Sequence, residues 1–246
     1  MGRNFLELCN EVLDIMFYTP AETFEDLDTI EGRLVKTKMN NVLREVCSGE
    51  QSIWSFRERE KRFYLVEGQN KYPLPNGYII YIRPNDKSNR GPLIYNENYK
   101  WLPMTSHGTP IQYWLFGNKI NLYPIPSKDQ DGLEYKIEYL TDNFAVDEDG
   151  NEKEVMTEAT DEPIIPEKYR SILVYGTAKN FRASRGDAKS EFYQKEFNNV
   201  YNDMLYNLRL TEDYVKGARV GDRPMSNLTA YLQSFYNPYI GSKRVQ

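Results

Sequence analysis

The change of hydrophobic period along the chain is the feature that most constrains its fold. Apolar residues recur at steps of three and four toward both ends, which is the period of an amphipathic helix. Residues in the middle of the chain alternate at every second position, which is the period of a half-buried strand. This order predicts an α+β chain, namely an antiparallel helical bundle with an inserted small antiparallel β-sheet or barrel and an extended C-terminal arm.

Four helices are expected from the three- and four-residue spacing. The first spans about 4–17, and the second covers 30–48 and stops at Gly49. A third begins at 165–167, where proline occupies a helix start. The fourth follows a break at 186–187. Its predicted apolar face consists of Phe192, Phe197, Val200, Tyr201, Met204, Leu205 and Leu208.

Strands are expected between the two helical regions. Residues 78–82 form a short run rich in Ile and Tyr, and residues 133–140 alternate strictly. Two further β-rich runs, 111–116 and 119–123, flank Gly-Asn, a typical two-residue hairpin turn. The middle of the chain therefore predicts a small antiparallel sheet or barrel.

These patterns divide the chain into five predicted parts. The N-terminal helices of the bundle cover 1–61, the β insertion 62–146, an acidic loop 147–162, the C-terminal helices of the bundle 163–210, and the arm 211–246.

Composition argues against most catalytic and membrane functions. The chain of 246 residues has a single histidine, His107, and lacks the glycine-rich motifs that bind phosphate groups. Cys9 and Cys47 are too far apart for a zinc motif, and we expect both to be reduced and buried. No run approaches the roughly 20 apolar residues of a membrane span. We therefore predict no enzyme activity, no cofactor, no metal and no membrane contact.

Two segments stand out by charge. Residues 147–162 contain eight acidic residues and one lysine, a net charge of −7 in a chain whose total is −5. A solvated loop is the simple interpretation. Residues 214–246 have five basic residues and one acidic residue, together with spaced aromatic residues. Such a segment either binds a groove on another chain or folds back on its own surface, and the sequence leaves both open.

The order of the motifs resembles the head-to-tail adaptor proteins of tailed bacteriophages, of the short-tailed type. The resemblance covers residues 4–210 and rests on these segments: "FLELCNEVL", "VKTKMNNVLREVCSGEQSIWSF", "YPLPNGY", "PIQYWLFGNKINLYPIP", "LEYKIEYL" and "IIPEKYRSILVYGTAKNFRASRGD". It is carried by their joint order, since each motif alone recurs by chance.

The resemblance implies a structural virion protein at the head-to-tail connector, assembled in the host cytoplasm. Such a protein forms a homo-oligomeric ring, a dodecamer, that docks on the portal protein after DNA packaging. It extends the DNA channel, through which double-stranded DNA passes without specific binding, and it provides the attachment face for tail proteins or further ring proteins below.

The resemblance also suggests roles for the two charged segments. The acidic loop would face the lumen or a neighbouring subunit through Asp147, Glu148, Asp149, Glu152 and Glu154. The arm would bind the portal through Tyr231, Leu232, Phe235, Tyr236, Tyr239, Lys243 and Arg244.

Three other classes of protein remain as alternatives. The 20 Tyr residues and the Trp residues of the β region would also suit a glycan- or surface-binding module of a phage tail. A small hydrolase is disfavoured by the single histidine, and a nucleic-acid-binding protein by the negative net charge.

Overall fold

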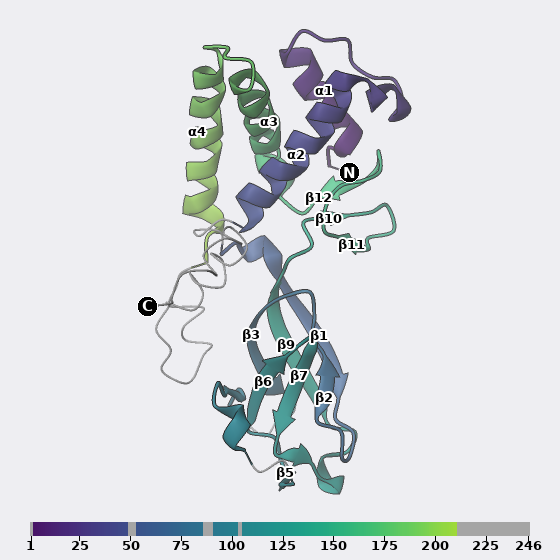
Figure 1. The fold of residues 1–246 in the computed structure, drawn as a ribbon, viewed down its shortest axis with the longest axis vertical. Coiled ribbons are helices and arrows are strands. Elements are labelled where there is room, and N and C mark those ends of the chain that lie inside the picture. Colours follow the sequence, from purple (N-terminus) through teal and green to yellow (C-terminus); the bar gives the residue numbers. More distant parts are fainter. Residues whose placement is uncertain (1, 49–52, 86–90, 103–104, 211–246) are drawn as a thin grey trace, which may run out of the picture. The chain divides into compact units, whose positions relative to one another are not determined.

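The computed structural model describes residues 2–48, 53–85, 91–102 and 105–210, and these separate into two compact units (Figure 1). The first, which we call the helical unit, consists of Met1–Phe56 and Asp142–Arg209. The second, the β unit, contains Arg57–Thr141. Each unit is described separately below.

The helical unit is built from two pieces of sequence that share one core. Its α-helices are α1 (Phe5–Ile15), α2 (Ile30–Ser48), α3 (Ser171–Ala183) and α4 (Ser190–Leu208). Its short 3₁₀ helices are η1 (Glu25–Asp28) and η5 (Glu167–Tyr169), with η2 (Ser55–Arg57) at the end of the first piece. Helix α3 packs against the other three helices, so it is the centre of this unit.

Three positions show how closely these helices approach. Gly176 of α3 faces α2 and α4, and a Cβ atom there would lie 2.6 Å from Val42 and 3.1 Å from the ring of Phe197. Leu43 of α2 is fully buried in the same core. Trp54 is also fully buried, and its indole Nε1 donates a 2.7 Å hydrogen bond to the carbonyl oxygen of Val46. The expected helical periodicity therefore marks most of the residues that are buried in α1, α2 and α3. Ile30 and Leu34 in the first turns of α2 fit the same spacing but are exposed.

A small sheet completes the helical unit. Its strands are β10 (Ala145–Val146), β11 (Glu152–Lys153) and β12 (Glu162–Pro163), in the order β11-β10-β12 and antiparallel. Part of the predicted acidic loop is thus strand.

The β unit consists of two main sheets with a core of their own. One sheet has the order β1-β9-β3, from β1 (Glu58–Tyr64), β9 (Glu134–Thr141) and β3 (Gly77–Pro84), all antiparallel. The other has the order β2-β7-β6-β4, from β2 (Lys71–Pro73), β7 (Lys119–Tyr123), β6 (Gln112–Phe116) and β4 (Ile94–Tyr95). The strands β5 (His107–Gly108) and β8 (Ile125–Pro126) pair separately, and η3 (Tyr99–Trp101) and η4 (Lys128–Gln130) lie between strands.

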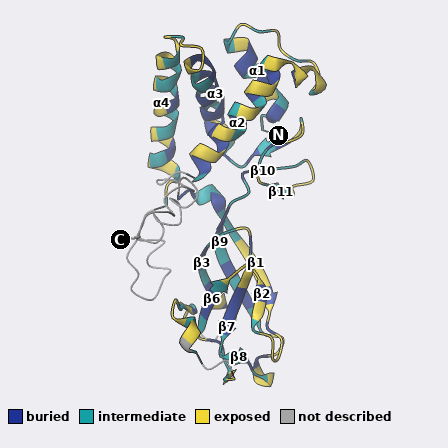
Figure 2. Ribbon diagram, viewed as in Figure 1, coloured by how far each residue is buried: buried dark blue, intermediate teal, exposed yellow. Residues whose placement is uncertain are grey.

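The inward faces of these two sheets form the core of the β unit. Its buried residues are Phe63, Leu65, Tyr72, Ile79, Ile82, Leu93, Tyr113, Ile120, Leu122, Tyr135 and Ile137. In the first half of β9, buried positions alternate with positions of intermediate burial (Figure 2). The Gly-Asn hairpin is present between β6 and β7, with Gly117 at a φ of 56°. Such a turn needs positive φ, which glycine adopts without a steric penalty.

The predicted fold class, a helical bundle with a small inserted sheet, is wrong. Over the described residues the chain is a mixed α/β structure with four α-helices and twelve strands in several sheets. The strands are not an appendage of a bundle, because two stacked sheets enclose a separate hydrophobic core. Hydrophobic period and turn chemistry identify the four α-helices and the strands β3, β6, β7 and β9, but they do not indicate how many independent cores the elements will form.

Leu43→Ala tests the core of the helical unit. Removing a fully buried leucine side chain leaves a cavity, so the free energy of unfolding should fall by about 2–5 kcal/mol. Urea unfolding measures this change. Asn41→Ala, at an exposed position of the same helix, is the control and should change stability by less than about 0.5 kcal/mol. Equal stability of the two variants would remove Leu43 from the core.

Candidate interaction surfaces

The acidic stretch 147–162 folds around one buried carboxylate. Asp161 is fully buried, and its side-chain oxygen lies 2.8 Å from Nζ of Lys153. The backbone N–H groups of Thr157 and Glu158 also donate to this carboxylate, at 2.6 and 2.9 Å. The backbone carbonyl of Asp161 accepts a 2.8 Å hydrogen bond from the N–H of Phe5, at the start of α1. Asp161 therefore organises the segment. It is buried, whereas the charge pattern alone suggested a solvated loop.

The hydrogen bonds determine the charge state of Asp161. Burial raises its pKa, but the hydrogen bonds from Lys153, Thr157 and Glu158 outweigh burial and hold the pKa below its usual range. The ionised form is the one that is stabilised. This contribution to stability is present above the ordinary pKa of 3.8 and is lost as the pH falls through the lower pKa of the folded state.

The five acidic residues predicted to face a lumen or a neighbour lie on the β10–β11 hairpin and just after it. Oδ1 of Asp147 accepts hydrogen bonds from the N–H groups of Asn151 and Asp149, at 2.7 and 3.1 Å, which holds the turn between the strands. Glu148 and Asp149 are exposed. The other two, Glu152 and Glu154, contact neighbouring side chains: Glu152 accepts from Asn143 at 3.4 Å, and Glu154 pairs with Arg44 of α2 at 3.0 Å.

A charge network that the sequence patterns did not reveal ties the N-terminal segment to the start of α3. The guanidinium of Arg170 is nearly buried and pairs with Glu162 at 2.9 Å and Glu167 at 3.1 Å. It also donates to the carbonyl oxygen of Arg3 at 2.7 Å. Glu167 in turn accepts from Nε of Arg3 at 2.6 Å. In this part of the sequence only Pro166, at the predicted helix start, indicated any structure. A proline there predicts backbone conformation and does not predict ion pairs.

Phe17 is an exposed aromatic residue in an unfavourable backbone conformation. It follows α1 with a φ of 63°, the left-handed region that glycine normally occupies at this position. The N–H groups of Phe17 and Tyr18 donate to the carbonyl oxygens of Asp14 and Leu13, both at 2.9 Å, which is the hydrogen-bond pattern of a Schellman motif. The side chain is 83% exposed, so packing inside the protein does not offset this conformation.

Phe192 is a second exposed aromatic residue of the helical unit. Lys189 lies with its Nζ 5.9 Å from the ring centre of Phe17, and Phe192 follows one helical turn later. Phe192 is 59% exposed, although helical spacing predicted it for the apolar face of α4. Of that face, Phe197 and Met204 are buried. The first turn of α4 lies beside the C-terminal end of α1, where the hydroxyl of Tyr193 donates a 3.3 Å hydrogen bond to the carbonyl oxygen of Ile15.

The structure also locates the other residues singled out in the sequence. Cys9 and Cys47 are buried and form no disulfide, as expected, and burial raises the pKa of Cys9 to about 12. His107 is exposed in the short strand β5. Trp114 is 4% exposed and stacks on Tyr99 with 5.4 Å between ring centres, so it does not form an open platform for a sugar. The seven predicted portal-binding residues, from Tyr231 to Arg244, lie outside the described residues.

No cluster of potential metal ligands is present among residues whose positions the structure gives. None of the helices described is long and apolar enough to cross a membrane.

Comparison with known proteins matches residues 3–222 to the family model described as SU10 adaptor protein. The comparison with curated proteins finds no match.

Asp161→Asn should lower the free energy of unfolding by about 1.5–3 kcal/mol near neutral pH. The substitution keeps the size of the side chain but removes a buried charge that accepts several hydrogen bonds. The matched control combines Glu148→Gln, Asp149→Asn and Glu154→Gln, which removes three exposed charges of the same segment and should change stability little.

Urea unfolding of these variants at several pH values measures the effect. The difference between the wild type and Asp161→Asn should shrink as the pH falls below about 3.8, because the carboxylate is protonated first in the unfolded state. It should be lost once the pH passes the lower pKa of the folded state. A difference that does not depend on pH would contradict a role for the ionised carboxylate.

Phe17→Gly should leave the protein as stable as the wild type or more stable, by up to about 1 kcal/mol. Glycine relieves the left-handed conformation, and an exposed ring loses little packing. Gly186→Ala is the reverse control: Gly186 has a φ of 67° and open space around it, so this variant should lose about 1 kcal/mol. Thermal unfolding compares them. A loss of stability in Phe17→Gly would mean that the ring contributes to the protein's own core.

Proposed function

Since the chain belongs to the SU10 adaptor protein family, we propose that it is the head-to-tail adaptor of a tailed phage, assembled as a ring on the portal protein. The family match over residues 3–222 makes the chain a phage adaptor protein, a structural component of the virion, and it is the observation that carries the proposal. The proposal goes further in four respects: the chain forms a ring, the ring has twelve copies, it encloses a DNA channel, and the phage is of the short-tailed type.

Several properties of the chain support this function. The net charge of −5 and the exposed acids of the β10–β11 hairpin suit a channel through which DNA must slide, because a basic lumen would retain the phosphate backbone. In the proposed ring, Asp147, Glu148, Asp149, Glu152 and Glu154 face the lumen or a neighbouring copy. Exposed aromatic residues such as Phe17, 83% exposed, and Phe192, 59% exposed, suit contacts with other proteins.

The mechanism of the proposed adaptor is multivalent attachment. A closed ring repeats one contact many times, so the release of a single contact leaves the ring held by the others. Each contact need not be strong for the whole assembly to be stable. The ring then extends the channel below the portal and presents a face to tail components.

Imaging tests the ring directly. The purified chain is mixed with the portal protein of the same phage, and the complex is examined by negative-stain microscopy and native mass spectrometry. We expect a closed ring of copies bound to the portal, even if the free chain is a monomer. A complex with one or two copies per portal would contradict the proposal.

The proposed portal-binding element is the arm, residues 211–246. A chain that ends at Leu210 retains the four α-helices of the described residues and both described cores, so it should keep the helix signal of α1 to α4 in circular dichroism. It should fail to co-sediment with the portal, because it lacks the aromatic anchors at Tyr231, Phe235 and Tyr236.

Full-length Tyr206→Ala is the control for this experiment, since Tyr206 is an exposed tyrosine that precedes the arm. It should bind the portal as the wild type does. Unchanged binding of the truncated chain would show that the arm is not the docking element. Unfolding of the truncated chain would assign the aromatic residues of the arm to the protein's own core.

A further inference from the structure

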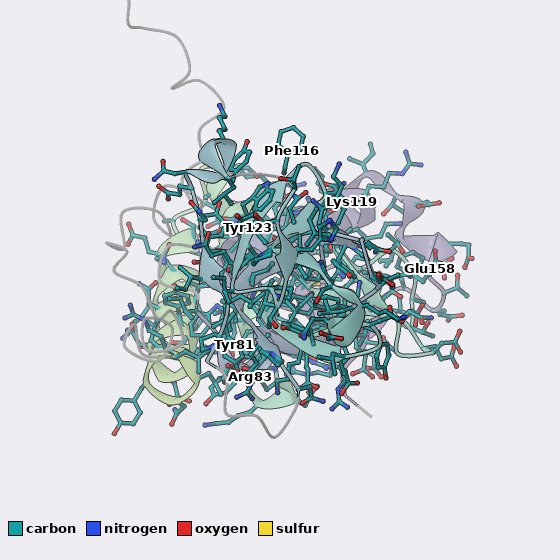
Figure 3. All side chains as sticks on the ribbon, turned by 90° about the horizontal axis from the view of Figure 1, so that it is seen from below. Tyr81, Arg83, Phe116, Lys119, Tyr123 and Glu158 are labelled. Carbon is teal, nitrogen blue, oxygen red and sulfur yellow. The ribbon has the colours of Figure 1, made fainter. Side chains whose placement is uncertain are left out.

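The two main sheets of the β unit have outer faces of different chemistry that point in opposite directions. Both sheets turn their inner faces to the same core, so their outer faces lie on opposite sides of the unit. Figure 3 shows Tyr81 and Arg83 on one side of this unit, and Phe116 and Lys119 on the other. We call these surfaces the ladder face and the lysine face.

The ladder face is the outer face of the sheet β1-β9-β3. Nζ of Lys136 in β9 lies 2.6 Å from Glu60 of β1 and 2.7 Å from Glu138 of the same strand. Arg83 of β3 lies 3.7 Å from Glu138 and covers the ring of Tyr81, at 5.2 Å from its centre. The charged residues of this face are Glu58, Glu60, Arg62, Arg83, Glu134, Lys136 and Glu138, which leaves one excess negative charge.

These ion pairs favour the ionised forms of Glu60 and Lys136 on the ladder face. Hydrogen bonds from Lys136 and Arg62 lower the pKa of Glu60, and hydrogen bonds to Glu138 and Glu60 raise the pKa of Lys136. The face also presents aromatic surface, because Tyr64 is 61% exposed at the end of β1.

The lysine face is the exposed part of the outer face of the sheet β2-β7-β6-β4. The centre of that outer face is covered, because Trp114 and Asn121 are buried there and Tyr99 stacks on Trp114. Lys119 of β7 has a paired residue on each neighbouring strand. Phe116 lies opposite it on β6, and Pro73 lies opposite it on β2. Phe116 is 68% exposed and Ile94 is 47% exposed. Lys71 and Lys119 are both exposed, and the outward positions of these four strands include no acidic residue.

We propose that the lysine face of one copy binds the ladder face of the next copy around the ring. This inference rests on the proposed ring. A ring requires a heterologous contact, in which two different surfaces of each copy meet, and surfaces on opposite sides of the β unit satisfy that requirement.

Charge and aromatic content favour this pairing over a contact between two like faces. Lys71 and Lys119 contribute two positive charges to one face, and the other has an excess of one negative charge. Two lysine faces would repel each other. Tyr64 offers an exposed ring to the lysines, and Phe116 supplies an exposed apolar anchor at the end of its hairpin.

Cross-linking tests the proposal on the assembled protein. Phe116→Cys and Tyr81→Cys are introduced together, and the portal-bound ring is treated with a short bismaleimide. The native cysteines, Cys9 and Cys47, are fully buried, so they should react little. We expect a ladder of covalent oligomers in a denaturing gel, because each copy offers one reactive cysteine to each neighbour.

The single-cysteine variants are the controls. Each one alone should give no cross-link, and a mixture of the two should stop at dimers. Dimers of the Phe116→Cys variant alone would indicate contact between like faces and would overturn the proposal. Rings that form without any cross-link in the double variant would also overturn it, while the proposed adaptor function would stand.

A second variant tests the energetics without chemical modification. Phe116→Asp should raise the concentration needed for half-maximal ring assembly by about tenfold or more, since it replaces an apolar anchor with a charge. Val66→Asp changes a similarly exposed apolar residue in the turn after β1 and should have little effect. Equal effects of the two variants would contradict the proposed contact. If the wild-type chain forms no ring on the portal, both the proposed function and this inference fail.

Discussion

The pairing of β1 with β9 is the constraint on which the rest of the structure depends. The chain leaves the helical unit after Phe56 and returns to it at Asp142. The two strands pair antiparallel from Glu58 opposite Leu140 to Tyr64 opposite Glu134. At the base of this pair, Nε of Arg57 donates a 2.9 Å hydrogen bond to the carbonyl oxygen of Thr141. The two ends of a long excursion are thereby held together, so the helices before and after it are able to share one core.

Two buried charged residues of the helical unit hold its connecting segments to its helices. Asp161 gathers Lys153 and two backbone N–H groups into a buried cluster, and its own carbonyl bonds the first turn of α1. Arg170 joins Glu162 and Glu167 to the N-terminal segment. Buried charges need partners of this kind, because an isolated charge in the protein interior is very unfavourable. Part of the negative charge of the segment 147–162 is therefore structural, and the exposed remainder is available for contacts.

The sequence predicted the elements better than their assembly. The second helix was expected over 30–48 and α2 is Ile30–Ser48, and the Gly-Asn turn is the β6–β7 hairpin. These are local properties, since apolar spacing and turn chemistry act within a few residues. The bundle with a small inserted sheet was wrong because the packing of two sheets against each other depends on contacts far apart in sequence. Phe192 fitted the apolar spacing of α4, yet it is exposed, and the buried residues of that helix are Phe197 and Met204.

The sequence by itself determined the period of each segment, the absence of familiar catalytic motifs and the resemblance to phage adaptors, which the family match supports. Only the tertiary structure decided which charges are buried and which faces remain open. Asp161 and Glu148 are both acidic residues of one segment, but one is enclosed by donors and the other is exposed. The physical reason is that a carboxylate's environment is created by groups brought to it through folding. Likewise, alternation shows that a strand has two faces, and only the stacking of the two sheets decides which face is covered.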